Sequence, residues 1–221
     1  MGGLLAAAAA VSLACGEAQS PPPPIDEAVL GLGDVPPDWT SVPLTDQSLL
    51  GPEYTACAGV EPLSLAGMVE RAESALLIGP SPAAQKVRSQ AMRFQSDERA
   101  TAALDALASG FRECGGALTR AAEAGFRAEA QARGANDIDE LGFSAEFSEA
   151  ALPGLGDQSA AFRMTISVGP FGVRGIQSYV LVRKGAVLGV MSYFSGPDDA
   201  AYAAVSVAVA DRVTQAASGG G

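Results

Sequence analysis

Residues 160–194 have the sequence AAFRMTISVGPFGVRGIQSYVLVRKGAVLGVMSYF, in which three apolar runs follow one another. Between Phe162 and Val168 every second residue is apolar and the residues between them are polar, a period typical of a β-strand with one buried face. The second run, 176–183, is rich in β-branched and aromatic residues, and Lys184-Gly185 separates it from the third run, 187–194. Because a two-residue connection joins only antiparallel neighbours, the stretch predicts a β-meander with at least one hairpin.

The polar side of the first strand indicates that the sheet is covered on one face only. Two amphipathic helices are the candidates for this cover. Residues 96–114 have apolar side chains at helical spacing, begin with the N-cap Ser96 and stop at Gly115-Gly116. The last helix begins after Pro197 and has a stripe of valines. We therefore expect an α+β fold, with an antiparallel β-sheet (a meander in the C-terminal half) and amphipathic helices packed on one face.

The remaining segments predict shorter elements. Apolar residues at roughly helical spacing predict a helix over 62–74, and the alanine-rich residues 117–133 predict a further helix, inserted on the surface. A single tryptophan in an irregular segment, Trp39, is more often a core anchor than a ligand platform. Short apolar runs predict strands over 76–78, 86–94 and 141–147.

The composition excludes several classes of function. A chain of 221 residues, 48% of them hydrophobic, has room for one domain with a sizeable core. No apolar run reaches the ~20 residues that a membrane-spanning helix needs. The net charge of −11 argues against nucleic acid and anionic lipid surfaces, which attract basic patches. Histidine is absent, which removes the usual general base and the commonest metal ligand, so we expect no enzyme activity, no metal and no cofactor.

The chain opens with an apolar run, 4–14, of the length typical of the hydrophobic region of a signal peptide. The run ends in Leu13-Ala14-Cys15, which resembles the lipobox of bacterial lipoproteins, whose cysteine takes a diacylglyceryl group. Leu13 stands two residues before Cys15 where the pattern has three, and no Lys or Arg precedes the run. We expect lipidation at Cys15; the alternative is a plain secreted protein in which Cys15 belongs to the apolar run.

Four prolines, Pro21 to Pro24, follow a short polar stretch and predict an extended spacer of ~3.1 Å per residue. The expected organisation is a signal peptide over residues 1-14, a lipid-anchor cysteine and Pro-rich tether over 15-24, a single α+β domain over 25-217 and a flexible tail over 218-221. The expected localisation is export, with anchoring to the outer face of the cell membrane as a lipoprotein. Contact with the membrane is expected through the N-terminal lipid only.

With Cys15 in the leader, Cys57 and Cys114 remain for the folded part. An even pair of cysteines after an export signal is typical of a disulfide. Cys114 lies on the apolar stripe of the helix 96–114, so a bond with Cys57 would clamp the irregular N-terminal part onto the core. A metal site needs further ligands, and no histidine is available.

Several short segments together resemble those of a known group. In chain order they are DVPPDW at 34–39, Cys57, FRECG at 111–115, LGDQS at 155–159 and VRKG at 182–185. This arrangement is similar to that of the actinobacterial lipoproteins related to the extracellular sensor domain of the Ser/Thr kinase PknH, and it extends over most of residues 25–217. The resemblance implies an α+β domain with an antiparallel sheet and a cleft that binds an unidentified ligand. It implies no catalytic residues, and relatives can carry two disulfides where this chain has cysteines for one.

We therefore expect a non-catalytic, sensor-like module that recognises a small ligand or a cell-envelope component. The alternative is a carrier that encloses a hydrophobic ligand or lipid in the cell envelope. An envelope hydrolase is disfavoured, because neither lysine of the chain stands in an S-x-x-K pattern.

Arginines on the polar face of the meander would make a positive spot, able to meet a carboxylate or phosphate, in this acidic chain. We expect Arg163 and Tyr179 to line the ligand-binding surface; the alternatives are that the arginines pair with surface carboxylates, or that the site lies in the groove beside residues 117–140.

Overall fold

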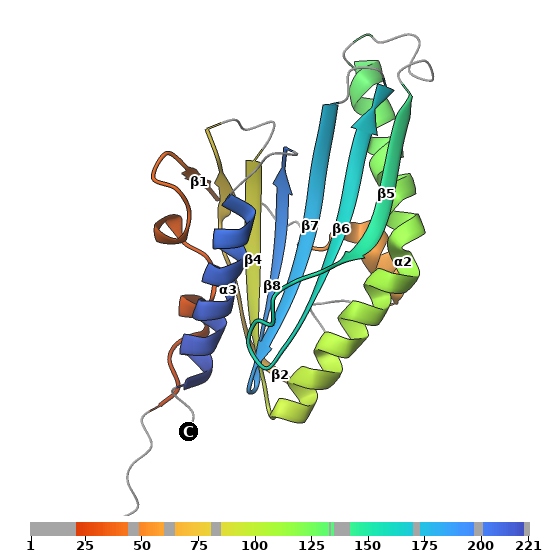
Figure 1. Cartoon of the computed structure of the whole chain (residues 1–221). Coiled ribbons are helices and arrows are strands. Elements are labelled where there is room, and N and C mark those ends of the chain that lie inside the picture. The colour runs from red at the N-terminus through yellow and green to blue at the C-terminus, as the bar shows by residue number, and fades with distance from the viewer. Residues whose placement is uncertain are drawn as a thin grey trace, which may run out of the picture.

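The computed structural model describes residues 21–43, 49–59, 65–80, 85–132, 134, 142–169, 173–196 and 201–218. Within these ranges, eight strands form one antiparallel sheet in the order β1-β3-β4-β8-β7-β6-β5, and β2 pairs with β4 off this path (Figure 1). The expected α+β class and the C-terminal meander are confirmed. The strands are β1 (Thr40–Val42), β2 (Met68–Glu73), β3 (Leu76–Ile78), β4 (Gln85–Phe94), β5 (Phe143–Ala150), β6 (Gln158–Val168), β7 (Val173–Lys184) and β8 (Val187–Ser195). The helices are α1 (Gly51–Ala58), α2 (Asp97–Ala132) and α3 (Ala201–Ser218), with 3₁₀ turns η1 (Ile25–Ala28) and η2 (Leu32–Asp34).

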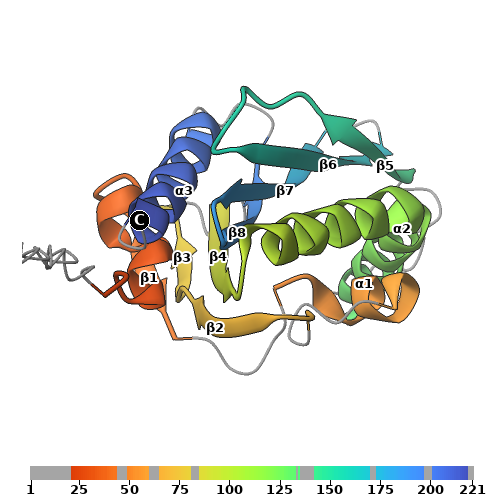
Figure 2. The same ribbon diagram turned by 90° about the horizontal axis from the view of Figure 1, so that it is seen from below.

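The sheet is covered on both faces, which corrects the expectation that helices pack on one face only. Side chains alternate along a strand, so neighbouring residues of β8 face opposite sides. Val187 and Met191 pack against the valine stripe of α3, whereas Leu188 and Val190 pack against the apolar stripe of α2. Figure 2 shows the sheet curving around α2, with α3 on its outer side.

The polar alternation of β6 suggested an open face because α3 does not cover the whole sheet. α3 contacts β7 and β8. On β6, the residue that belongs to the hydrophobic core under α3 is Ala161. Beyond that point the neighbouring strand β5 exposes Ser144, Glu146 and Ser148 on the same side. The polar residues of β6 thus correctly indicated an open face at the end of the sheet next to β5. The prediction that the whole sheet has one uncovered face was wrong.

The N-terminal segment packs beside α3. Trp39 is 5% exposed and stacks on Tyr193, with the ring centroids 6.2 Å apart, which confirms its role as a core anchor. The backbone nitrogen of Leu30 donates a hydrogen bond to Ser89 Oγ over 2.8 Å. Arg212 of α3 forms an ion pair with Asp34 at 3.0 Å. These contacts attach the residues that follow the proline run to both β4 and α3.

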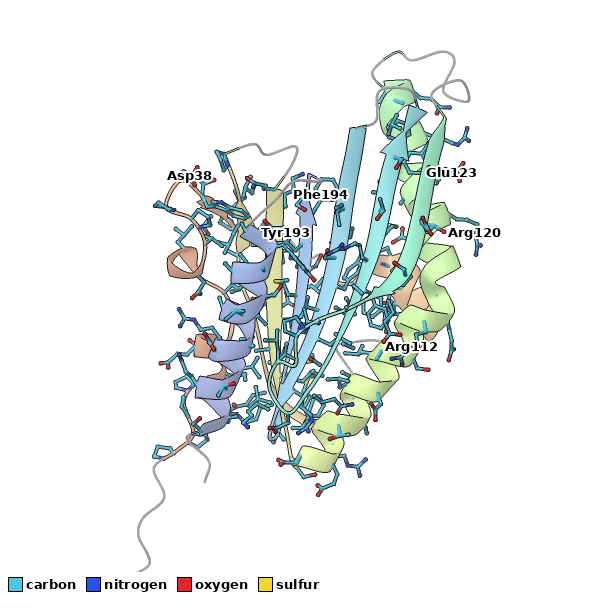
Figure 3. All side chains as sticks on the ribbon, viewed as in Figure 1. Asp38, Arg112, Arg120, Glu123, Tyr193 and Phe194 are labelled. Atoms are coloured by element: carbon cyan, nitrogen blue, oxygen red, sulfur yellow. A yellow bond between two sulfur atoms is a disulfide. The ribbon has the colours of Figure 1, made fainter. Side chains whose placement is uncertain are left out.

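α2 is a single helix of 36 residues, whereas the sequence predicted a stop at Gly115-Gly116 and a surface insertion beyond it. Neither glycine has the left-handed conformation that ends a helix. A Cβ on Gly115 would lie 2.6 Å from the Phe147 ring, so the glycine permits α2 to lie directly against β5. Arg112 of α2 reinforces this contact through an ion pair with Glu149 at 2.9 Å (Figure 3).

Residues 68–73 form β2, which corrects the helix expected over 62–74. β2 pairs with β4, with Ala72 opposite Ala91, and Glu70 forms an ion pair with Arg93 at 2.8 Å. The hydrogen-bond ladder along β4 outweighs the weak helical spacing of this segment. The strands expected over 76–78, 86–94 and 141–147 are confirmed as β3, β4 and β5, with β5 shifted toward the C-terminus.

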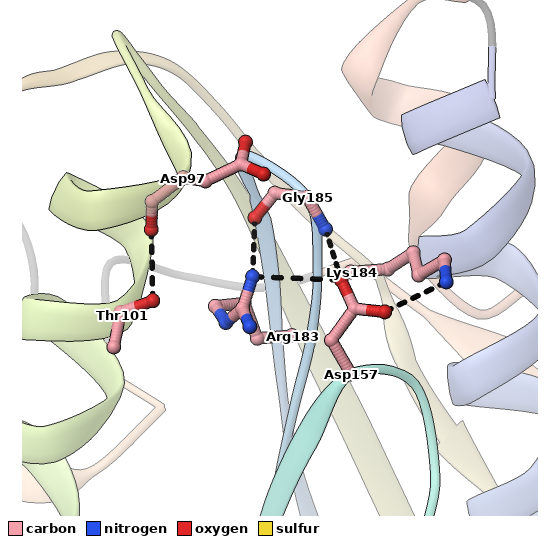
Figure 4. A network of polar contacts seen from close by, with 6 residues as sticks. All are labelled: Asp97, Thr101, Asp157, Arg183, Lys184 and Gly185. Carbon is pink, nitrogen blue, oxygen red and sulfur yellow. Dashed lines mark hydrogen bonds and ion pairs between the residues drawn. The ribbon is translucent and has the colours of Figure 1, made fainter.

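Asp157 fixes the start of β6 to the turn between β7 and β8 (Figure 4). Its carboxylate accepts hydrogen bonds from the Gly185 backbone nitrogen at 2.9 Å and from Lys184 Nζ at 2.7 Å. The hydrogen bond from Gly185 and then that from Lys184 lower the pKa of Asp157 below its ordinary value. Gly156 has a φ of 63°, and a Cβ there would collide with the Arg183 carbonyl, so only glycine fits this turn.

The expected signal peptide and Cys15 lie outside the described residues. In the part of the chain that is described, no helix is long and apolar enough to cross a membrane.

Candidate ligand-binding groove

Two neighbouring hollows lie on the α2 side of the sheet, toward the upper ends of β4, β7 and β8 in Figure 1, and we call them together the groove. They share Arg88, Gln177 and Ser192. The first, of about 300 Å³, is also lined by Leu76, Lys86, Val87 and Phe194. The second, of about 360 Å³, is also lined by Leu49, Leu50, Glu53, Leu118, Ala121, Ala122, Met164 and Tyr179.

Strand register builds the floor of the groove. Ser192 of β8 lies opposite both Arg88 of β4 and Tyr179 of β7, which places these three side chains in one row across three strands. In the next row, Phe194 of β8 lies between Lys86 and Gln177. Directly opposed residues in an antiparallel sheet have side chains ~5 Å apart on the same face. The floor therefore has one polar row and, beside it, a row with an aromatic ring at its centre.

A glycine makes room for that ring. A Cβ on Gly175 of β7 would lie 2.7 Å from the Phe194 ring, so Phe194 lies directly over the strand backbone at this position. Figure 3 shows Phe194 beside Tyr193 near the upper end of β8. The two neighbours face opposite sides of the sheet, Tyr193 toward Trp39 and Phe194 toward the groove.

One wall of the groove consists of the start of α1 and the middle of α2. The Cys57–Cys114 disulfide joins these two helices with the Cα atoms 5.8 Å apart, which confirms the expected pairing. Tyr54 of α1 is fully buried and donates a hydrogen bond to the Leu107 carbonyl of α2 at 2.8 Å. A Cβ on Gly110 would collide with the Tyr54 hydroxyl, so this glycine permits the close approach of α1. The wall is therefore fixed covalently and by packing.

Arg88 is the charged group of the polar row. Its side chain is 13% exposed, and its guanidinium lies 3.8 Å from Glu73 of β2. Burial lowers the pKa of Arg88 from its ordinary value, and the nearby Glu73 carboxylate opposes this shift. Arginine nevertheless stays protonated at physiological pH, so the row carries a partly desolvated positive charge.

The other polar groups near Arg88, Ser192 and Tyr179 in its row and Gln177 in the next row, are neutral hydrogen-bonding groups. Gln177 Nε2 donates to Ser192 Oγ over 2.9 Å. Burial, and to a lesser degree the charge of Glu53, raises the pKa of Tyr179 to about 12, so its hydroxyl is protonated at neutral pH. The combination of a guanidinium, two hydroxyls and an amide suits a polar ligand group that accepts hydrogen bonds.

The structure separates the two residues that the sequence proposed as one recognition surface. Phe162 lies opposite Tyr179, and Arg163 lies opposite Ser178, so Arg163 and Tyr179 face opposite sides of the sheet. Arg163 faces α3, where its guanidinium lies over the Tyr202 ring at 5.7 Å. Tyr179 lines the groove. The expectation of a joint surface is corrected by this register.

The alternative location, beside residues 117–140, agrees in part with the groove. Leu118, Ala121 and Ala122 of α2 line it, while residues 133 and 135–140 lie outside the described residues.

The sequence analysis missed Arg88 and Ser192. The signal was the polar residues Lys86, Arg88 and Gln90 at every second position of the strand, alternating with the apolar Val87 and Ala91 on its other side.

A further hollow of about 420 Å³ lies at the lower end of the sheet, lined by Asp97, Glu98, Thr101, Ala102, Asp105, Asp157 and Arg183. It is strongly acidic, and its Asp157 and Arg183 already belong to the turn network described above. Among the described residues, no group of three or more His, Cys, Asp or Glu side chains is placed to hold a metal ion. The groove is therefore the better candidate site.

Comparison of the sequence with protein-family models and with curated proteins finds no match. A solved structure does match: the crystal structure of the extracellular domain of PknH from Mycobacterium tuberculosis, with a TM-score of 0.52 and 9% sequence identity. The chain shares its fold with that domain. The match covers 88% of this chain and 96% of the PknH domain, so it extends well beyond the meander.

Removal of the disulfide tests the construction of the wall. We expect the double variant Cys57→Ala/Cys114→Ala to lose about 2–5 kcal/mol of unfolding free energy, because the bond closes a loop with a sequence separation of 57 residues. The measurement is urea unfolding of wild type and variant. Wild type under reducing conditions is the control and should approach the variant. Unchanged unfolding midpoints, with both thiols open to labelling in the exported protein, would contradict the bond.

Proposed function

We propose that the chain is a lipid-anchored extracytoplasmic module, sensor-like and non-catalytic, that binds a small ligand or a small part of a cell-envelope component in the groove. The observation that carries this proposal is the polar row Arg88–Ser192–Tyr179 between apolar walls. Pockets that bind small ligands typically combine an apolar lining with a few convergent polar groups. The fold shared with an extracellular domain supports a place outside the cytoplasm.

Binding without catalysis is supported by the contacts of the polar row. A catalytic serine needs a neighbouring base that accepts its proton. Ser192 Oγ instead accepts a hydrogen bond from the Gln177 amide, and the charged neighbour in its row is Arg88, which cannot act as a base at neutral pH. The row is therefore equipped to hold a ligand rather than to attack one.

The orientation of the groove also supports recognition of a ligand from outside the membrane. Arg93, near the lower end of β4, donates hydrogen bonds to the Pro23 carbonyl at 2.6 Å and to the Ala216 carbonyl at 3.4 Å. The proline run therefore leaves the domain at the lower end of the sheet. Lys86 lies seven residues away along β4, about 23 Å for an extended strand. With an anchor at Cys15, the groove would face away from the bilayer.

The groove favours a small ligand over the alternative of an enclosed lipid. Its two hollows of about 300 and 360 Å³ are open to solvent and share the polar residues Arg88, Gln177 and Ser192. A lipid carrier needs a continuous apolar cavity that removes acyl chains from water. Arg88 and Gln177, at the place where the two hollows meet, interrupt any such cavity.

Native mass spectrometry of the chain purified from its host tests the proposed site. Wild type should retain a small-molecule adduct, and Ala122→Trp should lose it, because an indole at this lining position fills the second hollow. Ala124→Trp, at an exposed position of the same helix, is the matched control and should retain the adduct. An adduct that persists in Ala122→Trp would refute the site, and one with the mass of a membrane lipid would favour the carrier.

Anchoring is tested separately at Cys15. Expressed in its host, the wild-type chain should partition into detergent with a lipid-modified N-terminus, and Cys15→Ala should leave the chain unprocessed or release it. Recovery of wild type in the aqueous phase, with an unmodified N-terminus beyond residue 15, would show that the anchor is absent while leaving the groove experiment valid.

A further inference from the structure

Tyr179 has a hydroxyl that the fold buries and does not use. The residue is 9% exposed and lines the second hollow of the groove. Its ring packs against Phe111, but none of the described residues forms a hydrogen bond with its hydroxyl. Burial of a hydroxyl without a partner costs free energy, so most buried hydroxyls in proteins are paired with protein, water or ligand. The hydroxyl of Tyr179 is therefore a place where a ligand group can form a hydrogen bond.

Two further groups of the floor have hydrogen-bonding capacity that the described part of the chain does not use. Ser192, directly opposite Tyr179, accepts a hydrogen bond from Gln177 Nε2, which leaves the hydroxyl hydrogen of Ser192 for another acceptor. No described donor reaches the amide oxygen of Gln177, which lines both hollows. Two neighbouring rows of the sheet thus provide two donors and one acceptor.

The charged residues of the groove do not favour a charged ligand. Arg88, at the boundary of the two hollows, is already engaged, with the Glu73 carboxylate 3.8 Å away among its contacts. Glu53 would repel an anion near Tyr179 in the second hollow. Lys86 is exposed, so water and salt screen its charge, and it would repel a cation in the first hollow. The neutral groups therefore decide which ligand fits.

These neutral groups match a secondary amide. The carbonyl oxygen of an amide accepts two hydrogen bonds, which the hydroxyls of Tyr179 and Ser192 can donate. The N–H of the amide donates one, which the amide oxygen of Gln177 can accept. Apolar side chains beside Tyr179, among them Leu118 and Met164, suit the methyl group of a small acyl chain. The second hollow is therefore suited to an acetamido group.

The first hollow suits a hydroxylated ring. Phe194 is half-buried there and lies in one row between Lys86 and Gln177. A pyranose has an apolar face of C–H groups, which packs on aromatic rings, and a rim of hydroxyls, which donate and accept hydrogen bonds. Lys86 and Gln177 lie on either side of Phe194, where such hydroxyls would be. An aromatic ring between two polar side chains thus complements both parts of a sugar.

We propose that the groove binds an N-acylated amino sugar, with the acetamido group between Tyr179 and Gln177 and the sugar ring on Phe194. This inference rests on the proposed function and specifies its ligand class. A sugar without the acyl group would leave the apolar side chains of the second hollow uncovered. A peptide amide would leave Phe194 uncovered. The test separates both of these ligands from the proposed one.

Matched probes test the amide and the sugar separately. Diacetylchitobiose has both, cellobiose has the same two sugar rings without the acetamido groups, and N-acetylalanine methylamide has amides without a sugar ring. Isothermal titration of the full chain at pH 7 should show saturable binding of diacetylchitobiose. Cellobiose and the alanine amide should each bind at least about tenfold more weakly, because each lacks part of the hydrogen bonds or of the apolar contact.

A pair of tyrosine variants assigns the effect to the groove. Tyr179→Phe removes the hydroxyl and keeps the ring, so it should weaken diacetylchitobiose binding about threefold to tenfold. Its urea unfolding midpoint should not fall, because no hydrogen bond within the described part of the chain is lost. Tyr202→Phe, which removes a hydroxyl on the α3 side of the sheet, is the matched control and should change the affinity by less than about twofold.

The comparison of diacetylchitobiose with cellobiose uses wild-type protein and therefore holds even if Tyr179→Phe fails to fold. Absence of saturable diacetylchitobiose binding, equal affinity for the two disaccharides, or equal losses of affinity in both tyrosine variants would each overturn the inference. Tighter binding of the alanine amide than of diacetylchitobiose would overturn it in favour of a peptide. In each of these cases the proposed function stands if Ala122→Trp loses the host-derived adduct, and it fails as well if the adduct persists in that variant.

Discussion

The pairing of β4 with β8 is the interaction on which the rest of the structure depends. It joins a strand of the N-terminal half to the C-terminal meander, from Gln85 opposite Ser195 to Arg93 opposite Val187. Because side chains alternate, this register sends Met191 to the α3 core and Ser192 to the groove. A shift by one residue would exchange the two faces of the strand. The core under α3 and the floor of the groove are therefore fixed by the same ladder of hydrogen bonds.

The second constraint is the attachment of α1 to α2. α1 has eight residues, too few for a helix that is stable by itself. The disulfide and the buried Tyr54 hold it against α2, and the glycines of α2 permit contacts with α1 on one side and with β5 on the other. A wall held in this way loses little conformational freedom when a ligand binds, which favours affinity for a small molecule. The fold thus presents a preformed groove on the side of the sheet that α3 does not cover.

Local sequence patterns predicted the elements in which buried residues recur at one regular spacing, every second residue in a strand or every third to fourth residue in a helix. The meander, the valine stripe of α3 and the disulfide follow from alternation, from helical spacing and from cysteine usage. The poor alternation of residues 86–94 has a physical cause: the odd-numbered Val87 and Ala91 are core residues, while the even-numbered Lys86 and Arg88 line the groove. Farther along the strand the even-numbered side passes under α2, where Met92 and Phe94 are buried, so apolar residues occur on both faces and the simple pattern of a half-buried strand is lost.

Local sequence patterns could not predict the site, because its floor combines three strands, β4, β8 and β7, and its wall combines two helices that are distant in sequence. Arg163 and Tyr179 were placed together from the composition of the meander, but the β6–β7 register turns them to opposite faces. The long α2 was divided at Gly115, since a glycine pair signals a helix end unless a close neighbour such as Phe147 requires the missing Cβ. In both cases tertiary contacts decided the outcome.

Mapping of amide chemical shifts by NMR, with the ligand recovered from the host protein, tests the central claim most directly. Addition of this ligand to the unliganded chain should shift the amides of Arg88, Gln177, Tyr179 and Ser192 most, together with those of the α2 wall near Leu118. Largest shifts on the other face of the sheet, around Arg163 and the start of α3, with the groove amides unmoved, would contradict a binding site between α2 and the β4–β8–β7 floor.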